Sequence, residues 1–218
     1  MTSIDPIAPY ELPVEALTGA DRTGWRPDPR RAALLVHDMQ RYFLRPFRQD
    51  VPPLSVALPN AVLLRQTCAS VGVPVFYTAQ PGGMTEEQRG LLGAFWGPGM
   101  AAAPEDRLVV DELAPAAADR VLTKWRYSAF QRTPLLDLLR AAGRDQLIVC
   151  GVYAHLGCLI TAVDAFGHDI QPFLVTDAVA DFSAEDHRLA VSYASHACAA
   201  TPTTKQVVED LLRGEGAQ

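Results

Sequence analysis

Residues 146–166, with the sequence QLIVCGVYAHLGCLITAVDAF, constrain the fold more than any other stretch of this chain. The apolar run 147–150 is rich in β-branched residues and is typical of a strand that is buried on both faces. Gly151 then interrupts the run, and a helical pattern follows it. The turn between strand and helix would lie at the carboxyl end of a strand, where open α/β sheets bind ligands and a helix N-terminus can bind an anion. A plain connection with a packing glycine is the alternative.

The helical pattern after this turn rests on Leu156, Ile160 and Val163, with Leu159 and Phe166 beside them. Apolar residues at positions i, i+4 and i+7 share one face of a helix. We therefore expect that face to pack against the sheet.

Further apolar runs alternate with helical patterns along the chain. Strands are expected at 31–38, 73–80, 120–124, 147–150 and 170–176, with a weaker one near 197–201, and helices at 56–71, 133–139, from 183 onward and at 204–212. Strands that alternate with helices predict an α/β fold: a doubly wound, Rossmann-like parallel sheet of about six strands with helices on both faces.

Composition narrows the class of protein. Hydrophobic residues make up 49% and charged residues 20% of the 218 residues, as in globular domains. The net charge of −6 argues against nucleic acid or an anionic membrane as a partner. There is no apolar run of the roughly 18 residues that a membrane span needs, so we expect a cytoplasmic protein. The four cysteines lack C-x-x-C spacing and are expected to be reduced and buried.

The chain divides into a short arm and one domain. Residues 1–30 are rich in proline and are expected to form an extended arm laid over the domain 31–218. Within the domain, residues 81–106 form a long glycine-rich insertion with one short helix expected. Loops of this length in compact domains are usually functional or mobile.

Polar residues follow the apolar runs at their carboxyl ends. Asp38, Gln80, Lys124 and the turn 151–157 all occupy this position. Because parallel strands end at one edge of a sheet, these residues should converge on one crevice. Each alone could be a turn residue or a surface charge, but an acid beside a lysine is a chemically capable pair.

Four segments show a resemblance to a known family. They are LLVHDMQRYF around Asp38, YTAQPG at Gln80, LTKWRYSAF around Lys124 and VCGVYAHLGC at 149–158. From about Arg30 to Leu212 the sequence resembles the isochorismatase family, and the last segment is similar to the true isochorismatases within it. The resemblance implies that residues 31–218 form an isochorismatase-like hydrolase domain.

The residue at position 157 differs from the catalytic pattern of the wider superfamily. Its cysteine amidohydrolases, such as nicotinamidases, carry an Asp–Lys–Cys triad whose nucleophile corresponds to position 157. This chain has Gly157 there and Cys158 one residue later, turned by about 100° around a helix. A thiol mechanism would therefore have to use a displaced Cys158.

The resemblance implies a vinyl ether hydrolase in siderophore- or phenazine-type secondary metabolism. Its substrate would be isochorismate or 2-amino-2-deoxyisochorismate, and its products pyruvate and a trans-dihydro-hydroxy compound. Asp38 would protonate the terminal methylene carbon as a general acid. Lys124 is the second catalytic residue and is assigned mainly to a substrate carboxylate. Two alternatives remain open: a nicotinamidase-like amidohydrolase that uses Cys158, and a binding member without turnover.

The substrate carries two carboxylates, so the site must supply hydrogen-bond donors. Arg89 is expected to clamp a carboxylate, assisted by Gln80 and by the backbone N–H groups of Tyr153 and Gly157. The expected aromatic walls of the site are Phe43, Trp96, Tyr127 and Tyr153, although Trp96 could instead cover the sheet edge.

The resemblance also bears on the turn and on partners. It implies a cis peptide at Val152-Tyr153 and a Gly157 that leaves room for the substrate ring. No cofactor or metal is expected, because His37 and His155 lack ligand spacing and stand among apolar residues. We expect a homodimer that binds a small dicarboxylate and neither nucleic acid nor membrane.

Overall fold

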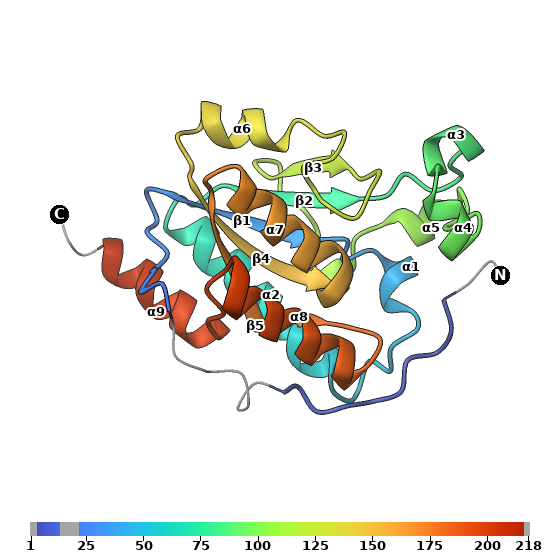
Figure 1. The fold of residues 1–218 in the computed structure, drawn as a ribbon, viewed down its shortest axis with the longest axis horizontal. Helices are drawn as coiled ribbons and strands as arrows, with labels where there is room; N and C mark the ends of the chain where they lie inside the picture. Colours follow the sequence, from blue (N-terminus) through green and yellow to red (C-terminus); the bar gives the residue numbers. More distant parts are fainter. Residues whose placement is uncertain (1–3, 14–21, 216–218) are drawn as a thin grey trace.

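A parallel five-stranded sheet forms the centre of the computed structural model, which describes residues 4–13 and 22–215 (Figure 1). The strands are β1 (Ala32–His37), β2 (Val75–Ala79), β3 (Arg120–Thr123), β4 (Gln146–Val152) and β5 (Gln171–Ala180). Their order in the sheet is β3-β2-β1-β4-β5. The strand order reverses between β1 and β4, so the topological switch point lies there. The predicted doubly wound α/β fold is therefore confirmed.

The sheet has five strands where about six were predicted. The weak strand expected near residues 197–201 contributes one isolated parallel bridge, between Phe173 and Ala200. The Leu174 N–H donates to the Ala200 carbonyl, and the Ala200 N–H donates to the Pro172 carbonyl. The Thr176 N–H donates to the Pro202 carbonyl, but Pro202 has no N–H to donate in return, so the pairing does not extend into a strand.

Helices cover both faces of the sheet. The helices of the described residues are α1 (Arg41–Leu44), α2 (Leu54–Ser70), α3 (Glu86–Arg89), α4 (Leu92–Trp96), α5 (Pro104–Arg107), α6 (Leu135–Ala141), α7 (Leu159–Gly167), α8 (Ala184–Ala197) and α9 (Thr204–Glu215), with a 3-10 turn η1 at Asp111–Leu113 and a π-helical turn η2 at Ala154–Cys158. Of these, α2 and α9 pack on one face of the sheet and α6, α7 and α8 on the other. Helix α8 starts as predicted, because the Ser183 side chain accepts a hydrogen bond from the Asp186 N–H.

The core consists of two layers because successive strand residues point to opposite faces. Leu34 of β1 packs in one layer with Leu64 of α2 and Val207 of α9. Leu35 packs in the other layer, which contains residues of α6, α7 and α8 such as Leu139. Both faces of β1 are fully buried, as an apolar run in a parallel sheet requires.

Helix α7 buries a different face from the one predicted. Ala162 and Ala165 are fully buried, whereas Ile160 and Phe166 are exposed. Alanines let the helix lie close against β5 and α8, so the small residues face the sheet. Of the larger residues on which the prediction rested, Ile160 and Phe166 remain at the surface, whereas Leu159 is buried and Val163 packs partly buried against the core.

The carboxyl ends of the strands meet at the right-hand edge of the sheet in Figure 1. Helices α1, α3, α4 and α5 gather at this edge, beside the start of the N-terminal segment. The insertion 81–106 contains three short helices where one was expected. Residues 4–13 and 22–28 run without helix or strand, and residues 14–21 of the predicted arm lie outside the described residues.

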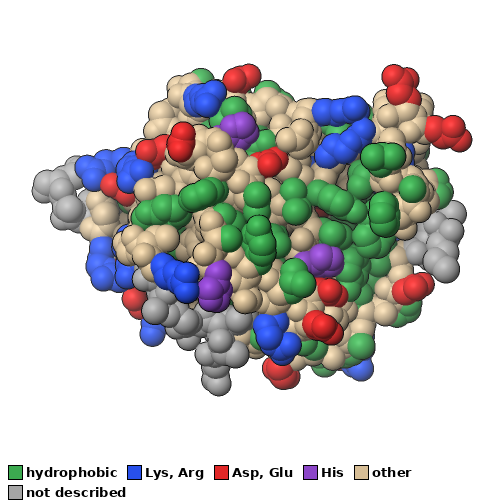
Figure 2. Space-filling model, viewed as in Figure 1, with side chains coloured by type: hydrophobic (Ala, Val, Ile, Leu, Met, Phe, Trp, Pro, Cys, Tyr) green, Lys and Arg blue, Asp and Glu red, His purple; other side chains and the backbone are tan. Residues whose placement is uncertain are grey.

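The surface over α7 and α8 is partly apolar. Figure 2 shows hydrophobic side chains across the middle of this face, which carries the exposed residues Ile160, Phe166, Leu189 and Tyr193. Among the described residues, no helix combines the length and the hydrophobicity needed to cross a membrane.

Candidate active site

A pocket of about 620 Å³ opens at the carboxyl edge of the sheet. It is lined by all nine residues that the sequence analysis nominated: Asp38, Phe43, Gln80, Arg89, Trp96, Tyr127, Lys124, Tyr153 and Gly157. They come from the segments that directly follow β1, β2, β3 and β4, including helix α1 and the turn η2, and from the insertion between β2 and β3.

Asp38 follows directly on β1 and has a positive φ of 49°, a conformation that Asp and Asn adopt more readily than other non-glycine residues. Asp38 forms two hydrogen bonds with Thr78 of β2. The Asp38 N–H donates to Thr78 Oγ1 at 3.1 Å, and the Thr78 hydroxyl donates to Asp38 Oδ1 at 2.6 Å. One carboxylate oxygen is therefore fixed by the neighbouring strand, and Oδ2 is left for other partners.

Lys124 supplies the partner of that second oxygen. Its Nζ lies 3.2 Å from Asp38 Oδ2, and only 2% of the lysine is exposed. Burial by itself would raise the pKa of Asp38, but the Lys124 charge and the Thr78 hydrogen bond outweigh it and hold the pKa below its usual range. The site thus contains an ionised Asp38 carboxylate paired with the Lys124 side chain.

His37 precedes Asp38 and is buried beneath the pocket. Its Nδ1 donates to the Val152 carbonyl at 2.8 Å, which identifies the neutral ring as the Nδ1–H tautomer. Burial lowers the pKa of His37 to about 4, and the nearby Lys124 charge acts in the same direction. His37 is therefore an uncharged side chain at neutral pH.

Gly157 is required for a different reason from the one expected. A Cβ atom at this position would lie 2.0 Å from His37 Cε1 and 2.6 Å from His37 Nε2. The space beside the Gly157 Cα is filled by the imidazole ring, so it is not left for a substrate ring.

The Arg89 side chain projects from α3 into the pocket, although only 7% of the residue is exposed to solvent. Its Nε donates to the Gly97 carbonyl at 3.0 Å, and its Nη1 lies 3.4 Å from Gln80 Oε1. Burial lowers the pKa of Arg89, and the positive charge of Arg126 adds to this effect. An anion placed between these two guanidinium groups would relieve their repulsion.

Aromatic side chains form one wall. The Trp96 Nε1–H donates to the Tyr127 hydroxyl at 2.6 Å, and the Tyr153 hydroxyl donates to the Phe43 carbonyl at 2.8 Å. Phe182 stacks on Tyr153 with ring centroids 4.1 Å apart and on Trp96 at 5.8 Å. The Val152-Tyr153 peptide that leads into this wall is cis, as predicted.

Several pocket residues were not predicted from the sequence. Arg126, Tyr42, Phe182 and the segment 4–6 all line the pocket. Arg126 stands two residues after Lys124, so a search for cations near strand ends would have found it. Phe182 was missed because β5 runs to Ala180, four residues beyond the predicted end of that strand.

Cys158 is fully buried and is not among the described residues that line the pocket. It packs in the apolar layer that contains Leu159 and Ala162. Burial raises the pKa of its thiol well above the usual value. A protonated, enclosed thiol is a poor nucleophile, so this geometry does not favour a cysteine mechanism.

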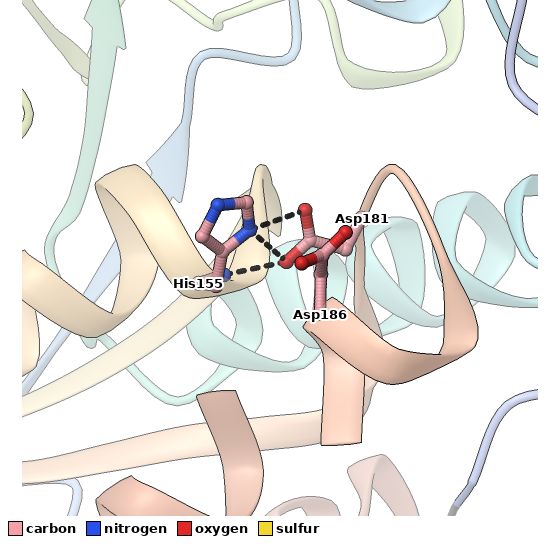
Figure 3. Close-up of side chains that lie close together, drawn as sticks. All are labelled: His155, Asp181 and Asp186. Carbon is pink, nitrogen blue, oxygen red and sulfur yellow. Dashed lines mark hydrogen bonds and ion pairs between the residues drawn. The ribbon is translucent and has the colours of Figure 1, made fainter. Parts of the chain in front are cut away.

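His155, Asp181 and Asp186 bring metal-ligating atoms within 4.8 Å of one another (Figure 3). These atoms already have partners. His155 Nδ1 faces both carboxylate oxygens of Asp181 at 2.8 and 2.9 Å, and Asp186 Oδ2 accepts from the Ser183 hydroxyl. The Asp181 carboxylate also accepts from the N–H groups of His155 and Phe182. This cluster is therefore explained as an ion pair that fixes the turn bearing Phe182.

Comparisons with known proteins agree with this architecture. The family model of the isochorismatase domain matches residues 32–206. The chain is 58% identical over 209 residues to phenazine biosynthesis protein PhzD1 of Pseudomonas aeruginosa, covering 96% of this chain and 100% of that protein. It is 47% identical over 191 residues to enterobactin synthase component B of Escherichia coli, covering 88% and 67%.

Among solved structures, a cysteine hydrolase from Pseudomonas syringae pv. phaseolicola superposes with a TM-score of 0.78 at 24% identity, covering 87% of this chain and 96% of that one. At that identity the likeness supports the fold alone. The match to the family model over most of the chain and the high identity to PhzD1 carry the assignment. The chain belongs to the isochorismatase family.

Proposed function

We propose that this protein is a vinyl ether hydrolase that removes the enolpyruvyl group of isochorismate or 2-amino-2-deoxyisochorismate as pyruvate. The observation that carries the proposal is the buried Asp38–Lys124 pair in a pocket whose described lining contains no cysteine. Such a pair can move a proton without forming a covalent intermediate. The names of the relatives, in phenazine and enterobactin biosynthesis, support a place in secondary metabolism.

In this mechanism the pair supplies a proton to carbon. Asp38 Oδ2 passes a proton to the terminal methylene of the vinyl ether, and the Lys124 ammonium is the source of that proton. The methylene becomes a methyl group, and the adjacent carbon becomes an oxocarbenium ion beside the restored carboxylate. Water adds to this cation and returns its proton to the pair. The resulting hemiketal then collapses: the bond between the former vinyl carbon and the ether oxygen breaks, and the proton of the hemiketal hydroxyl passes to that oxygen. Pyruvate and the ring alcohol are released.

The two guanidinium groups are proposed to hold the two substrate carboxylates. Arg89 and Arg126 both line the pocket, and Arg89 is buried without a carboxylate partner among the described residues. This differs from the assignment of Lys124 to a substrate carboxylate, because Lys124 contacts Asp38 in the structure. The Arg89–Gln80 contact involves Gln80 Oε1, so the Gln80 amide nitrogen is left as a donor for the substrate.

A coupled assay tests the proposal. Pyruvate release from isochorismate and from the 2-amino analogue is followed with lactate dehydrogenase and NADH. We expect turnover of at least one substrate, resistant to thiol alkylation because Cys158 is enclosed. Absence of pyruvate release from both would favour a binding protein, and loss of turnover on alkylation would favour a Cys158 amidohydrolase. The homodimer and the cytoplasmic location remain predictions, which size-exclusion chromatography and cell fractionation would test.

A further inference from the structure

The N-terminal segment 4–13 reaches the pocket although it precedes the matched family domain, which begins at residue 32. Ile4, Asp5 and Pro6 line the pocket beside the aromatic wall. Behind them the segment is attached to the domain. The Ile7 N–H donates to the Pro46 carbonyl at 2.9 Å, and Ile7 is buried in the core.

Tyr10 makes the most specific attachment of this segment. The Asp181 N–H donates to the Tyr10 hydroxyl oxygen at 2.7 Å. His187 Nε2 lies 3.0 Å from the Thr176 carbonyl and must donate to it, so the other ring nitrogen, Nδ1, carries a lone pair. The Tyr10 hydroxyl lies 3.2 Å from that Nδ1 and 3.3 Å from the Asp181 carbonyl, and these are the two acceptors for its proton. The Tyr10 hydroxyl thus acts as both a hydrogen-bond acceptor and a hydrogen-bond donor.

The hydrogen-bond network reaches Asp181, which directly precedes Phe182 of the aromatic pocket wall. Asp181 is fully buried, and its carboxylate accepts from the Phe182 N–H at 2.8 Å and from His155. Phe182 then stacks between Tyr153 and Trp96, which both line the pocket. The position of the Phe182 ring therefore depends on the turn that Tyr10 holds.

We propose that the N-terminal segment is part of the active site: residues 4–6 cover the pocket, and Tyr10 is a positioning residue that sets the aromatic wall through Asp181 and Phe182. The ligand class rests on the proposed function, a cyclic dicarboxylate. Asp5 places a negative charge at the pocket that receives this dianion, so it acts against substrate binding.

Two variants test the two parts of the proposal. Tyr10→Phe keeps the ring and removes the hydroxyl with its hydrogen bonds to Asp181 and His187, and we expect KM to rise about fivefold with kcat within about twofold. Asp5→Asn should lower KM about twofold at low ionic strength, and the difference should vanish in high salt. A purely structural role of the segment predicts no such salt dependence.

Matched controls separate these effects from general ones. Glu11→Gln removes the same charge from the same segment at an exposed position outside the pocket lining, and Tyr193→Phe removes an exposed phenol hydroxyl from α8. Both control variants should have the KM, the kcat and the salt dependence of the wild-type protein.

A ligand-free measurement keeps the test independent of the substrate. Acrylamide quenching of Trp96, taken as the difference from the Trp96→Phe protein, should increase in Tyr10→Phe because the stack on Phe182 loosens. If the wild type releases no pyruvate, the proposed function fails, and this quenching still decides the role of Tyr10. Unchanged quenching in Tyr10→Phe, or kinetics of both variants equal to wild type where turnover exists, would overturn the proposal.

Discussion

The imidazole of His37 fills the space that a side chain at position 157 would need. A Cβ at Gly157 would approach His37 Cε1 to 2.0 Å, far inside van der Waals contact. The ring cannot turn away freely, because its Nδ1 is bonded to the Val152 carbonyl at 2.8 Å. His37 and Gly157 therefore require each other, and together they exclude a thiol from the position that the amidohydrolases of the superfamily use.

This relationship predicts non-additive substitutions. Gly157→Ala should destabilise the protein by about 1–3 kcal/mol, as overpacking in a buried site does. In the His37→Ala background the same change should cost much less, because the ring is absent. Urea unfolding of the two single variants and the double variant measures the coupling energy. Additive effects would show that the ring moves aside without cost.

Asp38→Asn should retain the fold and lose most turnover. Asn tolerates the positive φ of 49° that Ala would not, so this variant separates chemistry from backbone strain. Loss of the proton-transfer group should lower kcat by on the order of 10²-fold or more. The lactate dehydrogenase-coupled assay measures kcat, and unfolding controls for stability. A kcat close to that of wild type would rule out Asp38 as the acid.

Cys158→Ala tests the remaining cysteine alternative. The thiol is buried in an apolar layer outside the pocket lining, so kcat should stay within about threefold of wild type while stability falls by about 1 kcal/mol. Ala is preferred to Ser because it buries no hydroxyl group without a partner. A folded but inactive Cys158→Ala protein would restore the amidohydrolase interpretation.

The strand ends were predictable because their signals are local. Apolar runs that end in Asp38, Gln80 and Lys124 identify both the strands and the edge where they meet, and the structure gathers these residues at one pocket. The buried face of α7 was not predictable in this way. Ala162 and Ala165 carry a weak hydrophobic signal, and the close approach of the helix to β5 selects them over Ile160.

Long-range contacts account for the rest of the site. Tyr10 bonds to Asp181 across 171 positions of sequence, and no local pattern connects them. Phe182 lines the pocket only because β5 extends past Thr176, where the apolar run is broken by Asp177. That residue faces away and caps α9, since its Oδ1 accepts from the Thr204 N–H and hydroxyl.

Acid should destabilise the protein through His37. The pKa of His37 is about 4 in the folded protein and about 6.5 when unfolded, so the unfolded state takes up the proton first as pH falls. The stabilisation is complete above pH 6.5 and is lost as pH falls towards 4, a change of roughly 3 kcal/mol. The lowered pKa of His187 acts in the same direction over this range, and the lowered pKa of Asp38 adds to the loss of stability only below about pH 4.

The free energy of unfolding measured from pH 7 to pH 4 checks this expectation. His37→Asn keeps a donor for the Val152 carbonyl but cannot titrate, so its stability should depend less steeply on pH than that of wild type. His196→Asn, at an exposed histidine, is the control and should keep the wild-type slope. Equal slopes for His37→Asn and wild type would mean that another group dominates the acid response.

Arg89 and Arg126 should contribute separately to substrate binding. Arg89→Lys keeps the charge but loses the planar fork that binds a carboxylate through two hydrogen bonds, so KM should rise about tenfold with a smaller change in kcat. Arg126→Lys should behave similarly, since Arg126 lines the same pocket. Arg140→Lys, at an exposed position on α6, is the matched control.

A variant that combines Arg89→Lys with Arg126→Lys shows whether the two guanidinium groups bind the same substrate carboxylate or one carboxylate each. If each guanidinium holds its own carboxylate, the losses in binding free energy should add, because the interactions are independent. If both hold the same carboxylate, the second substitution should cost clearly less than the first. Steady-state kinetics on isochorismate, at fixed ionic strength, separates these cases. Additivity would support one arginine for each carboxylate, and a wild-type KM in either single variant would remove that arginine from the binding site.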